Sequence, residues 1–200
     1  MTINISWWNV NKRFYLFQNP EKLLKSIFDE SHDMIFISET NLGFEALPSF
    51  DNYTLVADPN KKLCTCGGIA WYVKDSLARH IFQTQFNESF ISFRLDIAPQ
   101  YIFIGVYIQP EGARSFNLNM FADVGALLAE CKEKGLTPYV GGDFNSRPGD
   151  LNVLDDDDTW KYEPNVDNNT NKHGRRFFKD LFRWKGETDK RSEVLSQNLC

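Results

Sequence analysis

The chain has 200 residues, of which 42% are hydrophobic and 14% aromatic, including 17 Phe. This composition excludes an intrinsically disordered chain and predicts one domain with a substantial core. The net charge of −5 argues against a protein that coats nucleic acid by bulk positive charge. The longest apolar stretches, such as 101–108, are too short to span a bilayer, so we expect no membrane partner.

Cysteine use and the N-terminus bear on the cell compartment. Cys64 and Cys66 are too close for the usual zinc-finger spacing, and no second pair follows them. Residues 1–4 do not form a basic patch followed by an apolar run, so no secretory signal is expected. We therefore expect an intracellular protein with reduced thiols, in the cytosol or the nucleus.

Strand and helix patterns alternate along the chain. The opening strand spans 3–10, and a helix begins at Asn19-Pro20, where Asn caps and Pro occupies the first turn. A second helix carries apolar residues from Phe121 to Cys131 and stops at Gly135, and a third spans 174–185. Further strands are predicted at 33–38, 53–57, 68–73, 80–86, 90–97, 101–107 and 137–141.

Several of these strands follow one another with only short turns between them, while others are joined through helices. This order predicts mixed sheets in an α/β sandwich, in which helices pack outside two stacked sheets. We expect one domain over 1–186 and a polar tail over 187–200, with the second sheet incomplete at its C-terminal end.

The charge is unevenly distributed in the last quarter of the chain. Residues 150–167 hold seven acidic residues against one lysine, and 172–200 hold eight basic residues against four acidic ones. The basic segment either contacts phosphates or is a solvated surface; the two interpretations have equal weight.

Polar residues follow several of the predicted strands. They are Asn9 and Asn11, Glu39, Tyr107, and Asp143 with Asn145. An ionised carboxylate directly after an apolar strand is costly unless a cation or a donor compensates it. Two such carboxylates with amides beside them form the oxygen-rich ligand set that Mg²⁺ prefers. The alternatives are a helix cap or salt-bridge partner for each carboxylate, and simple turn formation for the asparagines.

The order of these segments resembles the endonuclease/exonuclease/phosphatase superfamily, which has the DNase I-like fold, and within it the endonuclease domains of non-LTR retrotransposons. The segments are WNVN (8–11), ISET (37–40), GGIAWYV (67–73), GVYIQP (105–110) and GDFNSRPG (142–149). A similar helix follows at 171–182, and the resemblance covers about residues 3–185.

This resemblance implies a divalent-metal-dependent DNA endonuclease, a hydrolase that nicks its substrate with Mg²⁺ or Mn²⁺, and hence a nuclear location. Glu39 would hold the metal with support from Asn9 and Asn11, and Asp143 would orient or deprotonate the attacking water. Tyr107 and Asn145 would contact the scissile phosphate. Residues that would grip neighbouring phosphates, with ordinary surface charge as the alternative, are Arg114, Arg147, Lys172, Arg175 and Arg176.

The sequence also departs from the family pattern. The final motifs, an Asp before an apolar strand and a terminal Ser-Asp-His, are absent. The histidines present, His32, His80 and His173, do not match that position. Two alternatives therefore stand beside the endonuclease. One is an inactive domain that binds or assembles, as a homodimer or with a partner protein on an open sheet edge. The other is a phosphomonoesterase of the same superfamily.

Overall fold

The structure of the protein, a computed structural model, describes residues 2–10, 32–61, 67–110, 113 and 119–145. The helices predicted at 19–28 and 174–185 and the polar tail at 187–200 lie outside these residues. The C-terminal segment, where the second sheet was expected to be incomplete, also lies outside the described residues.

The first sheet has the strand order β1-β2-β4-β3. Its parallel pair is β1 with β2, and β4 runs antiparallel to both of its neighbours. Short helical turns follow β2 and β4. The elements are β1 (Ile5–Asn9), β2 (Met34–Ser38), the 3₁₀ helix η2 (Phe44–Ala46), β3 (Tyr53–Val56), β4 (Ile69–Lys74) and α2 (Asp75–Ala78).

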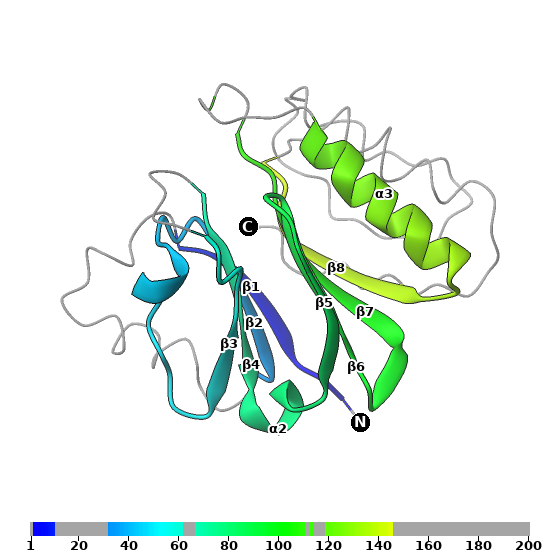
Figure 1. Cartoon of the computed structure of the whole chain (residues 1–200), viewed down its shortest axis with the longest axis horizontal. Coiled ribbons are helices and arrows are strands. Elements are labelled where there is room, and N and C mark those ends of the chain that lie inside the picture. Colours follow the sequence, from blue (N-terminus) through cyan, green and yellow to red (C-terminus); the bar gives the residue numbers. More distant parts are fainter. Residues whose placement is uncertain (1, 11–31, 62–66, 111–112, 114–118, 146–200) are drawn as a thin grey trace, which may run out of the picture.

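The second sheet has the order β5-β6-β7-β8 and stands beside the first (Figure 1). Antiparallel pairing joins β5 to β6 and β6 to β7, while β8 is parallel to β7 and is reached through α3 on the outer face. The elements are β5 (Ile81–Phe86), β6 (Phe90–Leu95), β7 (Ala98–Tyr107), α3 (Asn119–Glu133) and β8 (Thr137–Asp143).

The two-sheet α/β sandwich predicted from the sequence is confirmed, with α3 outside it. Several strand bounds differ from the prediction: β1 is shorter than the predicted 3–10, β7 begins earlier than 101, and β8 extends beyond 141. β6 ends at Leu95 and not at 97, because Asp96 and Ile97 form the tight turn into β7. The prediction also missed α2 and η2, which are too short to show a helical repeat.

Alternation along the strands builds one core between the sheets. From the first sheet Phe36 and Trp71 point inward, and from the second sheet Phe93 and Phe103 do the same. All four side chains are almost completely buried, and Trp71 packs edge-on against Phe93 with ring centroids 5.5 Å apart. Truncating a buried aromatic side chain of this kind to Ala costs about 3–5 kcal/mol. This core therefore holds the two sheets at a fixed separation.

A second core lies between the outer face of β7 and α3. It contains Ile104 and Val106 from the strand and Val124 and Leu128 from the helix. Cys131 belongs to the same cluster, where burial raises the pKa of its thiol to about 11. The thiol is therefore neutral at physiological pH and serves as a packing group.

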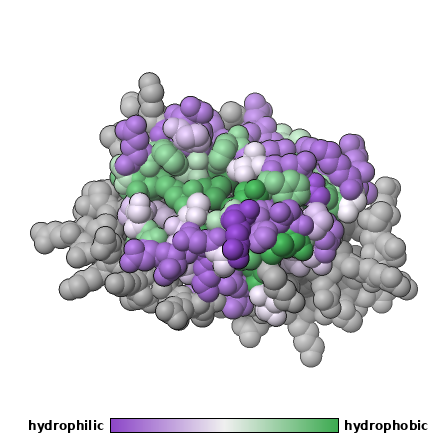
Figure 2. Space-filling view, turned by 60° about the horizontal axis from the view of Figure 1, so that its bottom comes forward, coloured by the Kyte–Doolittle hydropathy of each residue, from purple (hydrophilic) through white to green (hydrophobic). Residues whose placement is uncertain are grey.

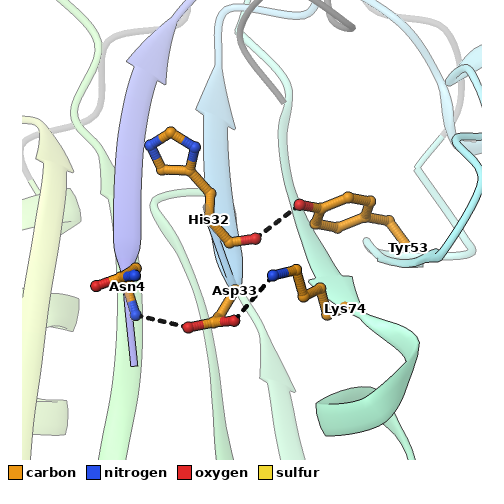
Figure 3. Close-up of polar contacts among 5 residues, drawn as sticks. All are labelled: Asn4, His32, Asp33, Tyr53 and Lys74. Carbon is orange, nitrogen blue, oxygen red and sulfur yellow. Dashed lines mark hydrogen bonds and ion pairs between the residues drawn. The ribbon is translucent and has the colours of Figure 1, made fainter. Parts of the chain in front are cut away.

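A polar network ties together the strands of the first sheet near the start of β2 (Figure 3). The Asp33 carboxylate accepts a hydrogen bond from the Asn4 backbone N–H at 2.9 Å and pairs with the Lys74 ammonium at 3.2 Å. The Tyr53 hydroxyl donates to the His32 carbonyl at 2.6 Å. These contacts fix the register of β1, β2 and β4 at the end of the sheet where β1 begins.

The interior of the sandwich reaches the surface at this same end. Figure 2 shows an apolar band there, framed by hydrophilic residues. Ile5, Ile81 and Tyr101, near the starts of β1, β5 and β7, are partly buried against the inter-sheet core. In the part of the chain that the structure describes, no helix is long and apolar enough to cross a membrane.

The Asp33 network yields a stability prediction. Asp33→Ala is expected to lower the free energy of unfolding by about 1–3 kcal/mol, because it removes the acceptor of two charge-assisted hydrogen bonds. Asp33→Asn, which keeps an acceptor for the Asn4 N–H, should lose less. Chemical denaturation followed by fluorescence measures both values.

The matched control is Asp96→Ala, since Asp96 pairs with His80 but its side chain is 63% exposed. Its effect should stay within about 0.5 kcal/mol. Equal effects of Asp33→Ala and Asp96→Ala would show that the network does not fix the strand register.

Candidate active site

The polar residues singled out in the sequence meet at one end of the sandwich. Asn9 is the last residue of β1, Tyr107 the last of β7 and Asp143 the last of β8. Glu39 directly follows β2, whose Ser38 is paired with Asn9. Each sheet contributes a parallel strand pair, β1 with β2 and β7 with β8, so the carboxyl ends of these strands lie together.

Two hydrogen bonds join these side chains across the gap between the sheets. The Asn9 amide donates from Nδ2 to Oδ2 of Asp143 at 2.6 Å. The Tyr107 hydroxyl donates to Oε1 of Glu39 at 3.2 Å. Both bonds are partly buried, and each pairs one residue of the first sheet with one of the second. The site is therefore a product of the packing of the sheets.

Asn145 holds the turn after β8 in place. Its backbone N–H donates to Oδ1 of Asp143 at 2.8 Å, and its side-chain Nδ2 donates to the Ile108 carbonyl at 2.8 Å. Both oxygens of the Asp143 carboxylate thus accept a hydrogen bond, one from Asn9 and one from Asn145. These contacts fix the direction of the carboxylate. The phosphate contact predicted for Asn145 stays a prediction.

The chain leaves β2 in a strained turn that aims Glu39. Glu39 has a φ of 57°, and Asn41 has a φ of 51°. Residues other than glycine adopt this region rarely, and such strain clusters at functional sites. The turn is held against the glycines before β4, because the Asn41 N–H donates to the Gly67 carbonyl at 2.7 Å and a Cβ on Gly68 would lie 2.3 Å from Thr40 Oγ1.

Gly142 is required for β8 to reach Asp143. Its φ is 133°, and a Cβ at this position would lie 1.9 Å from the carbonyl oxygen of Val106 on β7. Only glycine accepts this backbone conformation beside a neighbouring strand. The glycine therefore brings the end of β8 close enough for Asp143 to pair with Tyr107.

The carboxylates of the site lack a cationic partner in the described part of the chain. No Lys, Arg or His side chain there lies within salt-bridge distance of Glu39 or Asp143; the ion pairs are Lys74–Asp33, His80–Asp96 and Lys134–Glu130. The net charge of the whole chain is −5. Carboxylates without a cationic partner favour the binding of a cation.

This donor set fits a hard divalent cation. Mg²⁺ is commonly held by one or two carboxylates and completes its shell with water and substrate phosphate. Glu39 and Asp143 supply two partly buried carboxylates at one place. Among the described residues, His, Cys, Asp and Glu form no cluster of three or more, and Asn11, a predicted ligand, lies outside the described ranges.

The described histidines are remote from the site. His80 Nδ1 lies 2.7 Å from Oδ1 of Asp96, between α2 and β5. His32 precedes β2, and its carbonyl accepts the Tyr53 hydroxyl (Figure 3). His173 lies outside the described residues, as do the basic residues predicted to grip phosphates, which are Arg114, Arg147, Lys172, Arg175 and Arg176.

A hollow beside the site contains a lysine that the sequence analysis did not single out. Its volume is only about 50 Å³. The lining includes Leu42, Phe44, Lys61, Gly68 and Asn87. Gly68 links the hollow to the site, because its carbonyl accepts the Thr40 N–H at 3.3 Å. Lys61 is partly buried and is followed by Lys62 in the sequence, which does not mark either lysine; only the fold places Lys61 here.

Comparisons with known proteins identify the fold. No family model matches the sequence, and no curated protein matches it either. The 3′ phosphatase NExo from Neisseria, solved with a product DNA hairpin, is similar with a TM-score of 0.56 and 16% identity over 74% of this chain. An AP endonuclease from Archaeoglobus fulgidus has a TM-score of 0.55 and 17% identity over 92% of this chain. One from Leishmania major has a TM-score of 0.53 and 13% identity over 72%.

These solved structures are endonuclease/exonuclease/phosphatase enzymes, and the chain has their fold, the DNase I-like α/β sandwich. The chain spans 60% of the length of the Neisseria protein, 71% of the Archaeoglobus one and 55% of the Leishmania one.

A substitution at Gly142 tests how β8 ends. Gly142→Ala is expected to lower the free energy of unfolding by more than about 2 kcal/mol, because the methyl group would collide with backbone in a left-handed conformation. The matched control is Gly125→Ala within α3, where a Cβ has nothing within 4 Å. It should raise stability by about 0.5–1 kcal/mol. Thermal unfolding measures the stability of both variants. A Gly142→Ala variant as stable as the unmodified chain would contradict the described end of β8.

Proposed function

We propose that this chain hydrolyses phosphodiester bonds of DNA with the help of a divalent cation, as a nicking endonuclease of retrotransposon type. The observation that supports this proposal is the convergence of Asn9, Glu39, Tyr107, Asp143 and Asn145 at one end of the sandwich. Their order along the chain is the order of the motifs on which the resemblance rests.

Glu39 is the proposed metal ligand, supported by Asn9 and Asn11, with Mg²⁺ or Mn²⁺ as the cation. A bound divalent cation would stabilise negative charge on the phosphate oxygens. Glu39 suits this role because the strained turn after β2 presents its carboxylate in the gap. The Tyr107 hydroxyl holds Oε1 from the opposite sheet, which fixes the orientation of the carboxylate.

Asp143 is the proposed general base. In this role it accepts a proton from the water that attacks phosphorus, or orients that water in line with the leaving oxygen. The hydrogen bonds from the Asn9 amide and the Asn145 N–H leave the carboxylate little rotational freedom. Such positioning lowers the entropic part of the barrier.

Tyr107 and Asn145 are the proposed donors to the charge that develops on the phosphate. Both lie at the ends of β7 and β8, beside Asp143. The wider grip on DNA is assigned to the basic residues named from the sequence, because phosphate contacts supply affinity without reading the bases. A DNA substrate agrees with the Neisseria neighbour, which is bound to a product DNA hairpin, and implies a nuclear location.

A nicking assay on supercoiled DNA with Mg²⁺ tests this proposal. The chain is expected to convert supercoiled to open-circular DNA, and Glu39→Ala and Asp143→Ala should each lower the rate by about 100-fold or more. Chelation by EDTA should abolish nicking.

Glu45→Ala serves as the control, since Glu45 is an exposed acidic residue in η2 after the site turn. It should nick at the rate of the unmodified chain. Nicking that survives both Glu39→Ala and Asp143→Ala would overturn the assignment of the site.

The neighbouring structures favour a second substrate class for the same site. One neighbour is described as a 3′ phosphatase and, in another structure, as a 3′-5′ exonuclease. An activity assay distinguishes the two classes with three substrates: a DNA hairpin with a 3′ phosphate, an internally intact duplex and an inositol phosphate. Release of phosphate from the hairpin without internal nicking would replace the endonuclease by a phosphomonoesterase.

An inactive binding or assembly domain is the other candidate. It is favoured by the absence of a histidine from the site within the described residues, where His32 and His80 lie elsewhere. This candidate predicts DNA binding without nicking, or association through a sheet edge as a homodimer or with a partner protein. Light scattering and binding to labelled DNA test it. A folded monomer that binds no DNA and no second copy would contradict it.

A further inference from the structure

We infer that Trp7 and Gly141 form a spacer that sets the distance between Asn9 and Asp143, so that Trp7 is a positioning residue for the site. A second spacer, formed by Phe36 and Gly105, does the same for Glu39 and Tyr107. The geometry of the two spacers is argued from the described side chains alone. The consequence of the spacers for catalysis rests on the proposed function.

The spacers are close contacts between a ring of the first sheet and a glycine of the second. A Cβ built on Gly141 would lie 2.0 Å from Cε2 of the Trp7 indole. A Cβ built on Gly105 would lie 2.1 Å from Cδ2 of the Phe36 ring. Each ring therefore occupies the space that a side chain would take, and its thickness sets how closely the strands approach there.

The first spacer lies directly beneath the Asn9–Asp143 hydrogen bond, and the glycine of the second spacer lies beneath Tyr107. Because side chains alternate along a strand, residues two apart share a face. Asn9 follows Trp7 by two positions on β1, and Asp143 follows Gly141 by two on β8. The same offset relates Gly105 to Tyr107 on β7. The layer below the site is therefore ring on glycine, and the next layer is the pair of hydrogen bonds.

A third ring packs beside the two spacers, in the same row of the first sheet. Trp71 is fully buried and contacts Phe36 with ring centroids 5.1 Å apart and Trp7 with centroids 6.4 Å apart. Its own Nε1 donates to the Ile91 carbonyl on the second sheet at 3.2 Å. This anchored ring therefore limits sideways movement of Phe36 and Trp7 along the sheet.

The indole of Trp7 is retained although its polar atom gains nothing. Trp7 Nε1 is buried and has no hydrogen-bond partner in the described structure, which is a cost. A ring of the size of Phe would avoid this cost. The shape of the indole, which fills the gap over Gly141, gives the reason for a Trp at this position.

The effect on chemistry follows from the sensitivity of catalysis to distance. A displacement of about 1 Å at an active site can lower a rate by about 100-fold. A methyl group on Gly141 pushes the Trp7 ring away and separates the ends of β1 and β8. It should therefore weaken the Asn9–Asp143 hydrogen bond before it affects the Glu39–Tyr107 bond.

The test measures the coupling between Asn9 and Asp143 by a double-mutant cycle of stability with Asn9→Ala and Asp143→Ala. In the unmodified chain the coupling should change the folding equilibrium constant by about fivefold or more. In a Gly141→Ala background it should vanish. In Trp7→Phe/Gly141→Ala, where the smaller ring makes room for the methyl group, it should return.

Measuring both couplings in a Gly105→Ala background shows whether each spacer acts on its own hydrogen bond. Gly105→Ala should remove the coupling between Glu39 and Tyr107 and leave that between Asn9 and Asp143 intact, whereas general loosening of the core would reduce both. Trp7→Phe alone is the second variant, should Gly141→Ala not fold. It should reduce the Asn9–Asp143 coupling, and the stability lost through the smaller ring should be partly offset, because the unpaired N–H is also removed.

A nicking assay adds the catalytic readout. Gly141→Ala should lower kcat by about tenfold or more with KM nearly unchanged, and the double variant should recover most of the rate. If the coupling between Asn9 and Asp143 persists in the folded Gly141→Ala and Trp7→Phe variants, the inference of a spacer is wrong. A chain that does not nick DNA but shows the predicted loss and return of coupling would overturn the proposed function and leave the spacer standing.

Discussion

The two sheets are in contact through aromatic rings and backbone: Trp7 lies on Gly141 and Phe36 lies on Gly105, with Trp71 beside them in the same row of the first sheet. This contact fixes the separation of the sheets within the limits of a well-packed core, where added or missing volume is felt at once. The arrangement of the site depends on this separation, because among the described strands none of one sheet pairs with a strand of the other.

The site uses this fixed separation to bring carboxylates together. Glu39 and Asp143 come from different sheets, and each is held by a donor from the opposite sheet, Tyr107 for the first and Asn9 for the second. Partly buried carboxylates are costly unless a donor or a cation compensates them, and these donors supply part of that compensation.

Much of this arrangement could be predicted from the sequence. Alternation revealed most strands, and apolar runs ending in Asn9, Glu39, Tyr107 and Asp143 marked the residues that the structure brings together. The prediction missed α2 and η2, whose few residues show no periodicity. It also missed Lys61, since nothing in the local sequence distinguishes this lysine from a solvated one.

The sequence by itself determined where the strands lie, to within a few residues at their ends, and which residues of each strand share a face, because the pleat fixes the alternation from local pattern alone. Only the tertiary structure decided which residues become partners. Asn9 and Asp143 are 134 positions apart, and Glu39 and Tyr107 are 68 apart. Their distances follow from the thickness of the aromatic layer between the sheets, and local sequence carries no measure of that thickness.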